Sequence, residues 1–380
     1  MASLLRPLRR SDFDSAVNGL KGDFKVRTLG CFDLFKTMLY ALITGCYGVR
    51  EIVTSLRVNK NNLYHSGMKT IKRSTFCDAL EKRDYGIFMK VFHDMVEVAQ
   101  KVGANAHKRF KDPLRIIDAS VISLCLKRFD WAKYRTAKGA IKIHMNLDGD
   151  KKIPYDAYIT TGNIHDVKEL PDLARESGVI YAMDRGYVDF KSLYNIEIAG
   201  STFVTRMKTN CTYKLVQKNR HKDEGKVLSD ILIELTGALV KTYYPKCLRK
   251  IKYHDKETGK TYEFLTNDMG RDAEEIAAIY KERWEVELFF KWIKQHLKIK
   301  SFWGTSMNAV VSQIWVALIL TILLWINKTL DGITASVHEL MLMLKTTLLT
   351  TNSLIGLCTN TEEEKPPDNS YQPLLEGFSC

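Results

Sequence analysis

The stretch from Tyr280 to Lys298 constrains the fold of this chain more than any other. It contains no glycine or proline and its apolar residues recur at helical spacing, so we expect one amphipathic helix. With about 100° of rotation per residue, one narrow stripe of that helix carries a phenol, a guanidinium, a carboxylate and three amines. The residues of the stripe are Tyr280, Arg283, Glu287, Lys291, Lys294 and Lys298. Large apolar side chains fill most of the remaining surface, so we expect the helix to be packed mostly inside the protein.

Two interpretations of this stripe are open when the helix is considered alone. In the first, the stripe is the solvated face of a core helix, and a Glu287–Lys291 ion pair contributes roughly a few tenths of a kcal/mol. In the second, the stripe is a functional face that works together with residues elsewhere in the chain. Two aspartates in unusual positions favour the second interpretation.

Asp118 and Asp184 both lie in apolar segments that are typical of buried strands. Asp118 interrupts the sequence IIDASVI, and Asp184 ends the sequence IYAMD. A lone aspartate at a strand end is usually a turn or cap residue, but a carboxylate in apolar surroundings is costly unless it is paired or binds a metal ion. Oxygen ligands of this kind suit Mg²⁺, and Mn²⁺ is able to substitute. We therefore expect Asp118, Asp184 and Glu287 to be metal ligands and catalytic acids.

The spacing of Tyr280, Arg283, Glu287 and Lys294 is itself a motif: tyrosine, two residues, arginine, three residues, glutamate, six residues, lysine. It resembles the Tyr-Arg-Glu-Lys signature of the DDE transposases of bacterial insertion sequences, in the family numbered four. The resemblance extends from about residue 10 to about residue 355. It includes the segments around both aspartates.

This resemblance implies an enzyme that cuts and joins DNA with a divalent metal ion. A metal-bound water would hydrolyse a phosphodiester at the end of the mobile element, and the freed 3′-hydroxyl would attack a second phosphodiester. Arg283, Lys291 and Lys294 would contact DNA phosphates, and Tyr280 would donate a hydrogen bond to one. The resemblance also implies binding to the terminal inverted repeats of the insertion sequence. It implies a homodimer on double-stranded DNA, because two ends must be held together.

The charge of the chain agrees with a polyanionic partner such as DNA. Its 380 residues include 57 lysines and arginines against 44 aspartates and glutamates, a net charge of +13. A basic protein without a nucleic-acid role, or one that binds membrane surfaces, would show the same excess. The eight cysteines are scattered without the spacing of a zinc site. We therefore expect free thiols in a reducing cytoplasm. The family resemblance implies that this is the bacterial cytoplasm, with the protein associated with the nucleoid.

One segment has the composition of a membrane span. Residues 309–326 are apolar over nearly the length that crosses a bilayer. The segment contains Ser312, Gln313 and Thr321 and closely follows the charged helix, so we expect a buried core helix and no association with a membrane. The N-terminus lacks the apolar run of a signal peptide.

Residues 1–107 are expected to form a helical N-terminal domain that binds DNA. Three short helices are predicted, the third from Thr75 to about Val102, with a basic cluster before it. This pattern is typical of a helix-turn-helix reader, in which Lys72 and Arg73 would contact phosphates at the start of the third helix. A plain helical packing domain explains the same pattern, and both interpretations stay open.

The rest of the chain has an α/β pattern. Short β-branched strands alternate with helices in the order strand, strand, strand, helix, strand, helix, strand. A ribonuclease-H-like mixed sheet with flanking helices is what the resemblance implies. The expected parts are a catalytic core at 108–207 and 264–350, a β-rich insertion at 208–263 that includes a strand at 238–245, and a disordered tail at 351–380.

Two other functions are compatible with these features. A nuclease or resolvase on the same fold would cleave DNA without joining a 3′ end to a target. A domesticated DNA-binding protein would bind a terminal repeat without catalysis. The presence of all three acidic residues argues against the second alternative.

Overall fold

The computed structural model describes residues 1–104, 108–135, 138–219, 226–297, 299 and 301–349. The α-helices are α1 (Ala2–Leu5), α2 (Arg10–Gly19), α3 (Cys31–Thr44), α4 (Val49–Val58), α5 (Arg73–Lys82), α6 (Gly86–Val102), α7 (Asp166–Leu173), α8 (Phe190–Ile198), α9 (Ala238–Tyr243), α10 (Ala273–Glu282), α11 (Trp284–His296), α12 (Met307–Leu330) and α13 (Val337–Thr347). The strands are β1 (Leu114–Leu124), β2 (Lys133–Arg135), β3 (Lys138–Asp148), β4 (Ile153–Thr161), β5 (Ile180–Met183), β6 (Thr202–Arg206), β7 (Tyr213–Lys218), β8 (Val227–Leu235), β9 (Leu248–Asp255) and β10 (Lys260–Thr266). Short 3₁₀ helices are η1 (Lys60–Asn62), η2 (Tyr64–Ser66) and η3 (Arg185–Tyr187). The tail at 351–380 that we expected to be disordered lies outside the described residues.

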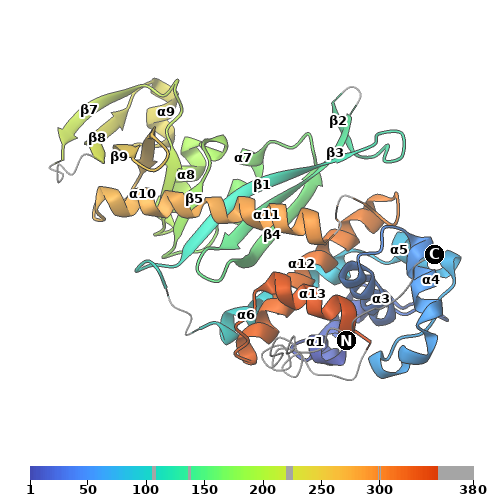
Figure 1. The fold of residues 1–380 in the computed structure, drawn as a ribbon. Helices are drawn as coiled ribbons and strands as arrows, with labels where there is room; N and C mark the ends of the chain where they lie inside the picture. Colours follow the sequence, from blue (N-terminus) through green and yellow to red (C-terminus); the bar gives the residue numbers. More distant parts are fainter. Residues whose placement is uncertain (105–107, 136–137, 220–225, 298, 300, 350–380) are drawn as a thin grey trace, which may run out of the picture.

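The described strands form one 10-stranded mixed sheet, in the order β2-β3-β1-β5-β6-β10-β9-β8-β7, with β4 also paired to β3. β1 runs antiparallel to β3 and parallel to β5, and β5 runs parallel to β6. Helices cover the sheet, and most of the other helices gather at one end of the molecule (Figure 1). The expected α/β class, a mixed sheet with flanking helices, is therefore confirmed.

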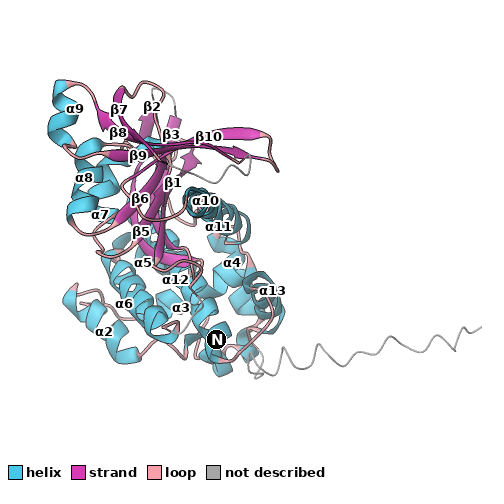
Figure 2. Ribbon diagram, turned by 90° about the vertical axis from the view of Figure 1, so that its left-hand side faces the viewer, coloured by secondary structure: helices cyan, strands magenta, loops and turns pink. Residues whose placement is uncertain are grey.

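The β-rich segment at 208–263 continues the core sheet. β10 pairs antiparallel with β6, and β9, β8 and β7 follow outward from it (Figure 2). The strand expected at 238–245 is wrong, because α9 forms there. Valine and threonine in this stretch favour a strand, but side-chain packing against neighbouring elements can override that preference. The ring of Tyr244 packs against that of Tyr194 on α8, with centroids 5.4 Å apart.

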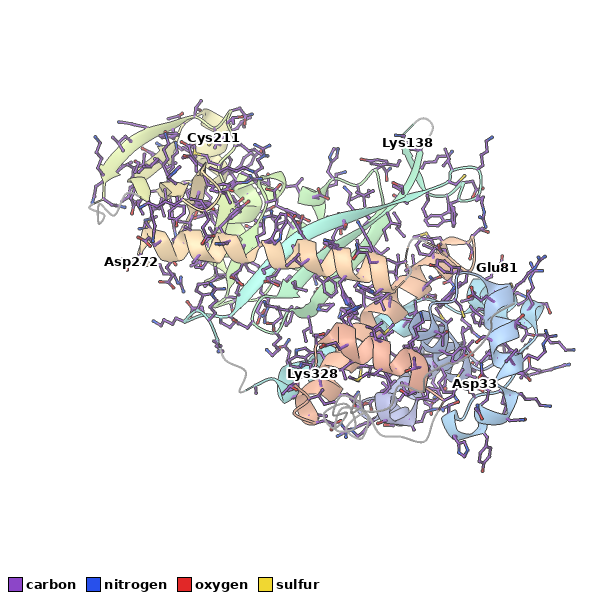
Figure 3. All side chains as sticks on the ribbon, viewed as in Figure 1. Asp33, Glu81, Lys138, Cys211, Asp272 and Lys328 are labelled. Carbon is purple, nitrogen blue, oxygen red and sulfur yellow. The ribbon has the colours of Figure 1, made fainter. Side chains whose placement is uncertain are left out.

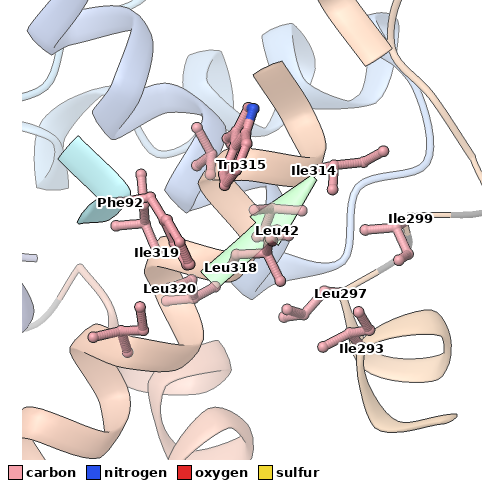
Figure 4. Packing of buried hydrophobic residues seen from close by; sticks show 14 of the residues in the cluster. Leu42, Phe92, Ile293, Leu297, Ile299, Ile314, Trp315, Leu318, Ile319 and Leu320 are labelled. Atoms are coloured by element: carbon pink, nitrogen blue, oxygen red, sulfur yellow. The ribbon is translucent and has the colours of Figure 1, made fainter. Parts of the chain in front are cut away.

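α12 is a core helix, as expected from the polar residues within its apolar sequence. It is long and apolar enough to cross a membrane, yet 94% of its apolar window is buried inside the protein. α12 packs against α3, α5, α6 and α13, so helices from both ends of the chain share one apolar core. Figure 4 shows Trp315 of α12 next to Phe92 of α6, and their ring centroids are 5.0 Å apart.

The helix expected from Thr75 to Val102 is two helices, α5 and α6. The chain turns between them, where the carboxylate of Asp84 accepts a hydrogen bond from the backbone N–H of Gly86 at 2.7 Å. A side chain that bonds to the backbone two residues ahead offers an alternative to the helical ladder, which is why the periodicity alone did not reveal this break.

The helix expected from Tyr280 to Lys298 is two helices that meet at Arg283. α10 begins after Asp272, which is labelled in Figure 3, and α11 continues in the same direction across one face of the sheet (Figure 1). At the junction the backbone N–H of Arg283 donates to the carbonyl of Tyr280. The backbone N–H of Val286 donates to the carbonyl of Arg283. These bonds span three residues instead of four, so the ladder tightens at Arg283. Lys298 lies outside the described residues.

Candidate active site

The sheet brings Asp118 and Asp184 next to each other. β1 and β5 are adjacent parallel strands, and the last pair in their register is Ile117 with Met183. Asp118 and Asp184 follow at the next position on each strand. Side chains at paired positions of neighbouring strands point to the same face of a sheet. Both carboxylates therefore lie on the face that α10 and α11 cross.

Glu287 joins this pair of aspartates through Arg283. Nη1 of Arg283 donates to Oδ2 of Asp118 at 3.0 Å, and Nη2 donates to Oε1 of Glu287 at 2.6 Å. The Arg283 side chain is only 13% exposed, so this double ion pair is largely shielded from water. The i,i+4 ion pair on the helix is thus Arg283–Glu287 and not the Glu287–Lys291 pair of the first interpretation.

The surroundings of Asp118, including the other two acids, shift its pKa. Burial raises the pKa of Asp118 to about 6, although a hydrogen bond from the N–H of Ala119 and the positive charge of Arg283 both act to lower it. The carboxylates of Glu287 and Asp184 raise this pKa further. Like charges have this effect only at short range, so the sheet and α11 hold three mutually repelling groups in one place.

Asp184 has an arginine partner that sequence reasoning missed. Nη2 of Arg206 donates to Oδ1 of Asp184 at 2.8 Å. Burial opposes ionisation of Asp184, but hydrogen bonds from Arg206 and from the backbone of Arg185 outweigh it and lower the pKa of this carboxyl. A usable signal was the arginine at the end of the strand TFVTR, since β6 is the parallel neighbour of β5.

Tyr280 lies buried beneath two arginines. Its ring packs against Phe264 with centroids 4.9 Å apart, and the guanidinium groups of Arg206 and Arg283 lie 5.9 and 5.7 Å from the ring centre. Its hydroxyl is buried with no hydrogen-bond partner among the described residues, and burial raises its pKa. In this position the ring supports both arginines, whereas the expected hydrogen bond to a phosphate needs a hydroxyl that reaches solvent.

A cavity of about 430 Å³ opens beside Asp118 and Glu287, and we call it the acidic cavity. Lys291 and Lys294 of α11 line it. Nζ of Lys294 donates to the hydroxyl of Ser120 and to a carbonyl of β1. Three of the six stripe residues, Glu287, Lys291 and Lys294, therefore line this cavity, as the functional interpretation of this helix requires.

Lys72 and Arg73 lie elsewhere. Lys72 is the residue before α5 and Arg73 is the first residue of that helix, and both side chains are exposed. Neither lines the acidic cavity. Arg73 instead lines a second cavity, of about 590 Å³, where the N-terminal helices meet the end of β1.

The donor set at the acidic cavity suits a divalent metal ion, but Arg283 now stands between two of its members. As the side chains are placed, no group of three His, Cys, Asp or Glu residues in the described part of the chain is ready to hold a metal. The guanidinium of Arg283 supplies the positive charge between Asp118 and Glu287. Glu287 and Asp184 raise the pKa of Asp118, so a cation bound near Asp118 would be stabilised by the negative charge around it. The carboxylates of Asp118, Asp184 and Glu287 are thus ligands of the type that suits a divalent ion, with the guanidinium of Arg283 between two of them in this structure.

This geometry defines a class of protein. Carboxylates that suit a divalent metal ion, next to arginine and lysine side chains that bind phosphate, are the parts of an enzyme that acts on phosphodiesters. The net charge of +13 agrees with a nucleic acid as the source of those phosphodiesters.

Comparison with known proteins gives the family. Residues 109–323, more than half of the chain, match the family model of the transposase DDE domain, and the chain belongs to that family. It is a transposase of the kind encoded by bacterial insertion sequences, an enzyme that binds DNA and catalyses its cleavage and strand transfer. Membership implies a divalent metal cofactor. Residues 1–69 match a domain of unknown function, DUF4372.

Three curated relatives carry transposase names. The chain is 36% identical over 261 residues to the transposase y4zB of Sinorhizobium fredii, covering 68% of this chain and 72% of the relative. It is 31% identical over 218 residues to the transposase of insertion sequence element IS5377 of Geobacillus stearothermophilus, covering 57% of each chain. It is 26% identical over 276 residues to the transposase of element IS4SA of Synechocystis, covering 71% of this chain and 76% of the relative.

A solved structure of another transposase also resembles the chain. It is the piggyBac transposase in a synaptic complex with hairpin DNA, with 13% sequence identity and a TM-score of 0.48, over 97% of this chain and 82% of that chain. A likeness at this TM-score is too weak to assign the fold.

Proposed function

We propose that this transposase uses Asp118, Asp184 and Glu287 as its catalytic acids in cut-and-paste transposition. It would cleave DNA at the terminal inverted repeats of its own insertion sequence and join the freed 3′ end to a target. The observation that supports this assignment most is that Asp118 and Asp184 each directly follow the last register pair of β1 and β5, Ile117 with Met183, and that Arg283 links Asp118 to Glu287.

Mg²⁺ is the cofactor we propose, with Mn²⁺ able to replace it, and the three acids would hold it. When bound, such an ion activates the attacking oxygen and stabilises the leaving one. Arg283 has two roles in this proposal: it neutralises Asp118 and Glu287 in the absence of metal, and it turns to a DNA phosphate when the metal displaces it. Arg206 keeps Asp184 ionised and oriented.

The residues proposed to contact DNA near the cleaved bond are those around the acidic cavity. Lys291 and Lys294 line the cavity beside the acids and would bind the phosphates that flank the reacting one. Tyr280 would act mainly through the two arginines that it supports, with its predicted phosphate contact dependent on their movement. Lys72 and Arg73 would contact the end DNA farther from the cleaved bond.

We also propose a more specific fold and a more specific transposase family for this chain. The strand order β4-β3-β1-β5-β6, with β3 antiparallel and β1, β5 and β6 parallel, supports a ribonuclease-H-like core. The spacing of Tyr280, Arg283, Glu287 and Lys294 supports the Tyr-Arg-Glu-Lys family of insertion-sequence transposases. We further propose that residues 1–107 bind the transposon ends, that two copies of the chain assemble on DNA, and that the protein works in the bacterial cytoplasm at the nucleoid.

The test is cleavage and joining of the inverted-repeat DNA that flanks the gene. With Mg²⁺ or Mn²⁺ the protein is expected to nick the repeat at its end and to join the 3′ end to a plasmid. Glu287→Gln and Asp118→Asn are expected to retain DNA binding and to lose cleavage by at least a thousandfold. Lys252→Gln, on β9, is the control that keeps both activities. Cleavage that survives Glu287→Gln would refute the assigned acid, and cleavage without any joining would favour the nuclease alternative.

A further inference from the structure

The second cavity, of about 590 Å³, lies where three distant parts of the chain meet, and we call it the arginine cavity. It is lined by the start of α4, the start of α5, the end of β1 with the loop after it, and the loop before α12. In Figure 3, Lys138 marks the β2–β3 hairpin and Glu81 marks α5, which lie on two sides of this end of the molecule. The helical part and the sheet both contribute, so a ligand bound there would contact both.

Three arginines from three different segments line this cavity. Arg50 lies on α4, Arg73 begins α5, and Arg128 lies in the loop after β1, and all three side chains are exposed. Within the described part of the chain, none of the three guanidinium groups makes a hydrogen bond or an ion pair. No aspartate or glutamate is among the described residues that line the cavity.

In this respect the three arginines differ from those next to the three acids. The arginines at the acidic cavity, Arg206 and Arg283, are both paired with carboxylates. Three unpaired guanidinium groups around one concave site repel one another, and they are stabilised by an anion that accepts hydrogen bonds from each. A phosphodiester backbone is such an anion, and each guanidinium presents its donors in the fork that a phosphate accepts.

β1 connects the arginine cavity to the acidic cavity. Asp118 to Ser120 line the acidic cavity and Ser123 to Cys125 line the arginine cavity. Five residues of a strand at about 3.4 Å each separate Asp118 from Ser123, which is about 17 Å. Because B-DNA rises about 3.4 Å per base pair, this separation corresponds to about five base pairs.

We propose that the arginine cavity binds backbone phosphates of the DNA end, about five base pairs from the phosphodiester that is cleaved. Arg50, Arg73 and Arg128 bind the phosphates, so the N-terminal helices and the catalytic sheet hold one DNA strand between them. This inference rests on the proposed function, because it places the cavity relative to the cleaved bond. It adds Arg50 and Arg128 to the residues that contact DNA.

The experiment removes single phosphate charges from the DNA and single arginines from the protein. A 40-base-pair duplex of the flanking inverted repeat is made with one neutral methylphosphonate at each position in turn, and the affinity of the full chain is measured in Ca²⁺, without cleavage. We expect the wild-type protein to lose about tenfold affinity at one or two positions about five base pairs from the cleaved bond. Arg128→Gln and Arg50→Gln should be about tenfold weaker on unmodified DNA and should lose nothing more at those positions.

Two further measurements separate a local contact from a general loss of charge. Each substitution should lower the slope of log affinity against log salt by about one, as for a single phosphate contact. The control is Arg175→Gln, an exposed arginine outside this cavity, which removes the same charge and should keep the full tenfold sensitivity to the methylphosphonate. Circular dichroism and the unfolding temperature of each variant show that it is folded.

The outcomes distinguish this inference from the proposed function. If Arg50→Gln and Arg128→Gln bind unmodified DNA like the wild type, or stay as sensitive to every methylphosphonate as Arg175→Gln, the arginine cavity does not bind this DNA. The protein can still cleave and join in that case. If the wild-type protein never cleaves the repeat but shows the arginine-dependent phosphate contact, the proposed function fails and the phosphate site stands without its position relative to a cleaved bond.

Discussion

Arg283 is the residue that connects two of the three candidate catalytic acids in the absence of metal. It donates to Asp118 and to Glu287 at the same time. Replacing it with glutamine leaves the acids facing one another with less compensation, so we expect Arg283→Gln to lower the free energy of unfolding by about 2 kcal/mol in EDTA. The loss should shrink when a divalent ion is added, because the metal takes over the neutralisation.

The measurement is thermal unfolding of Arg283→Gln and of the wild-type protein, each in EDTA and in Mg²⁺ or Mn²⁺. We expect the metal to raise the unfolding temperature more in the variant. Arg271→Gln is the matched control, since Arg271 bridges Asp112 and Asp268 away from the acidic cavity. An equal rise in all three proteins would contradict the idea that Arg283 and the metal compete for the same carboxylates.

His144 on β3 makes the stability depend on pH. Its side chain is fully buried, and burial lowers its pKa to about 4, with Asp166 opposing this effect and Lys142 adding to it. In the unfolded chain a histidine titrates near 6.5. Between these values the unfolded state binds a proton at this residue that the folded state excludes, so the contribution of His144 to stability falls as the pH falls from about 6.5 to about 4. The full contribution of this residue is about 3 kcal/mol.

Urea unfolding at pH 7.5 and pH 5 tests this contribution. His144→Gln keeps a polar group for the hydroxyl of Thr160, which lies 2.9 Å from Nε2, but no longer takes up a proton. We therefore expect a smaller loss of stability on acidification in this variant than in the wild type. His65→Gln, at an exposed position, should show the wild-type loss. The same loss in both variants would exclude His144 as its source.

The residues of the site differ in how visible they are in the sequence. Asp118 and Asp184 were found because a carboxylate within or at the end of an apolar strand is costly, and Glu287 because its helix carries a polar stripe. Arg206 was missed, because its link to Asp184 depends on β6 being the parallel neighbour of β5. The burial of Tyr280 was missed too, since the helical period places it on the polar stripe while Phe264 of β10 covers it.

At the scale of elements, strands with regular alternation were predictable and local breaks were not. β1, β3, β4, α7, β5, α8 and β6 follow one another in the predicted order. α9 formed in a strand-prone stretch, and the expected helices at 75–102 and 280–298 were each interrupted. These breaks arise from single contacts, such as the turn at Asp84 and the tightened ladder at Arg283, which leave the apolar period almost unchanged.

α12 leads to a prediction about the N-terminal helices. It packs among α3, α5 and α6, so a fragment of residues 1–104 would expose the apolar face that α12 covers. We expect this fragment to unfold without cooperativity and to bind a hydrophobic dye. Joining residues 301–349 to it through a flexible linker should restore cooperative thermal unfolding, measured by circular dichroism.

The control for this prediction is Leu318→Asp in the joined fragment. Leu318 is fully buried on α12, and a charge there should abolish the restored folding. Cooperative unfolding of residues 1–104 alone would instead show that the N-terminal part has a sufficient core of its own. In that case the predicted domain boundary at residue 107 would also separate two parts of the chain that fold independently.

The whole molecule carries one acidic cavity on its described surface next to α11 and a separate arginine cavity, within a chain of net charge +13. We expect a chain with one such pair of cavities to bind one DNA end, but cut-and-paste transposition joins two ends to one target. We therefore predict that two copies of the protein hold two ends together. Repeat-end duplexes of two lengths, mixed with the protein in Ca²⁺, should give three complexes on a native gel: short–short, short–long and long–long.

The intermediate, short–long band is the decisive result. A protein that binds single ends gives only two complexes, whatever its own oligomeric state. Glu287→Gln should keep all three bands, since it removes an acid and leaves the phosphate contacts in place. A chain tagged to change its mass, mixed with the untagged chain, should split the complexes again if two protomers are present. Two bands from mixed duplexes, at protein concentrations that support joining, would contradict paired ends and favour an enzyme that acts on each end separately.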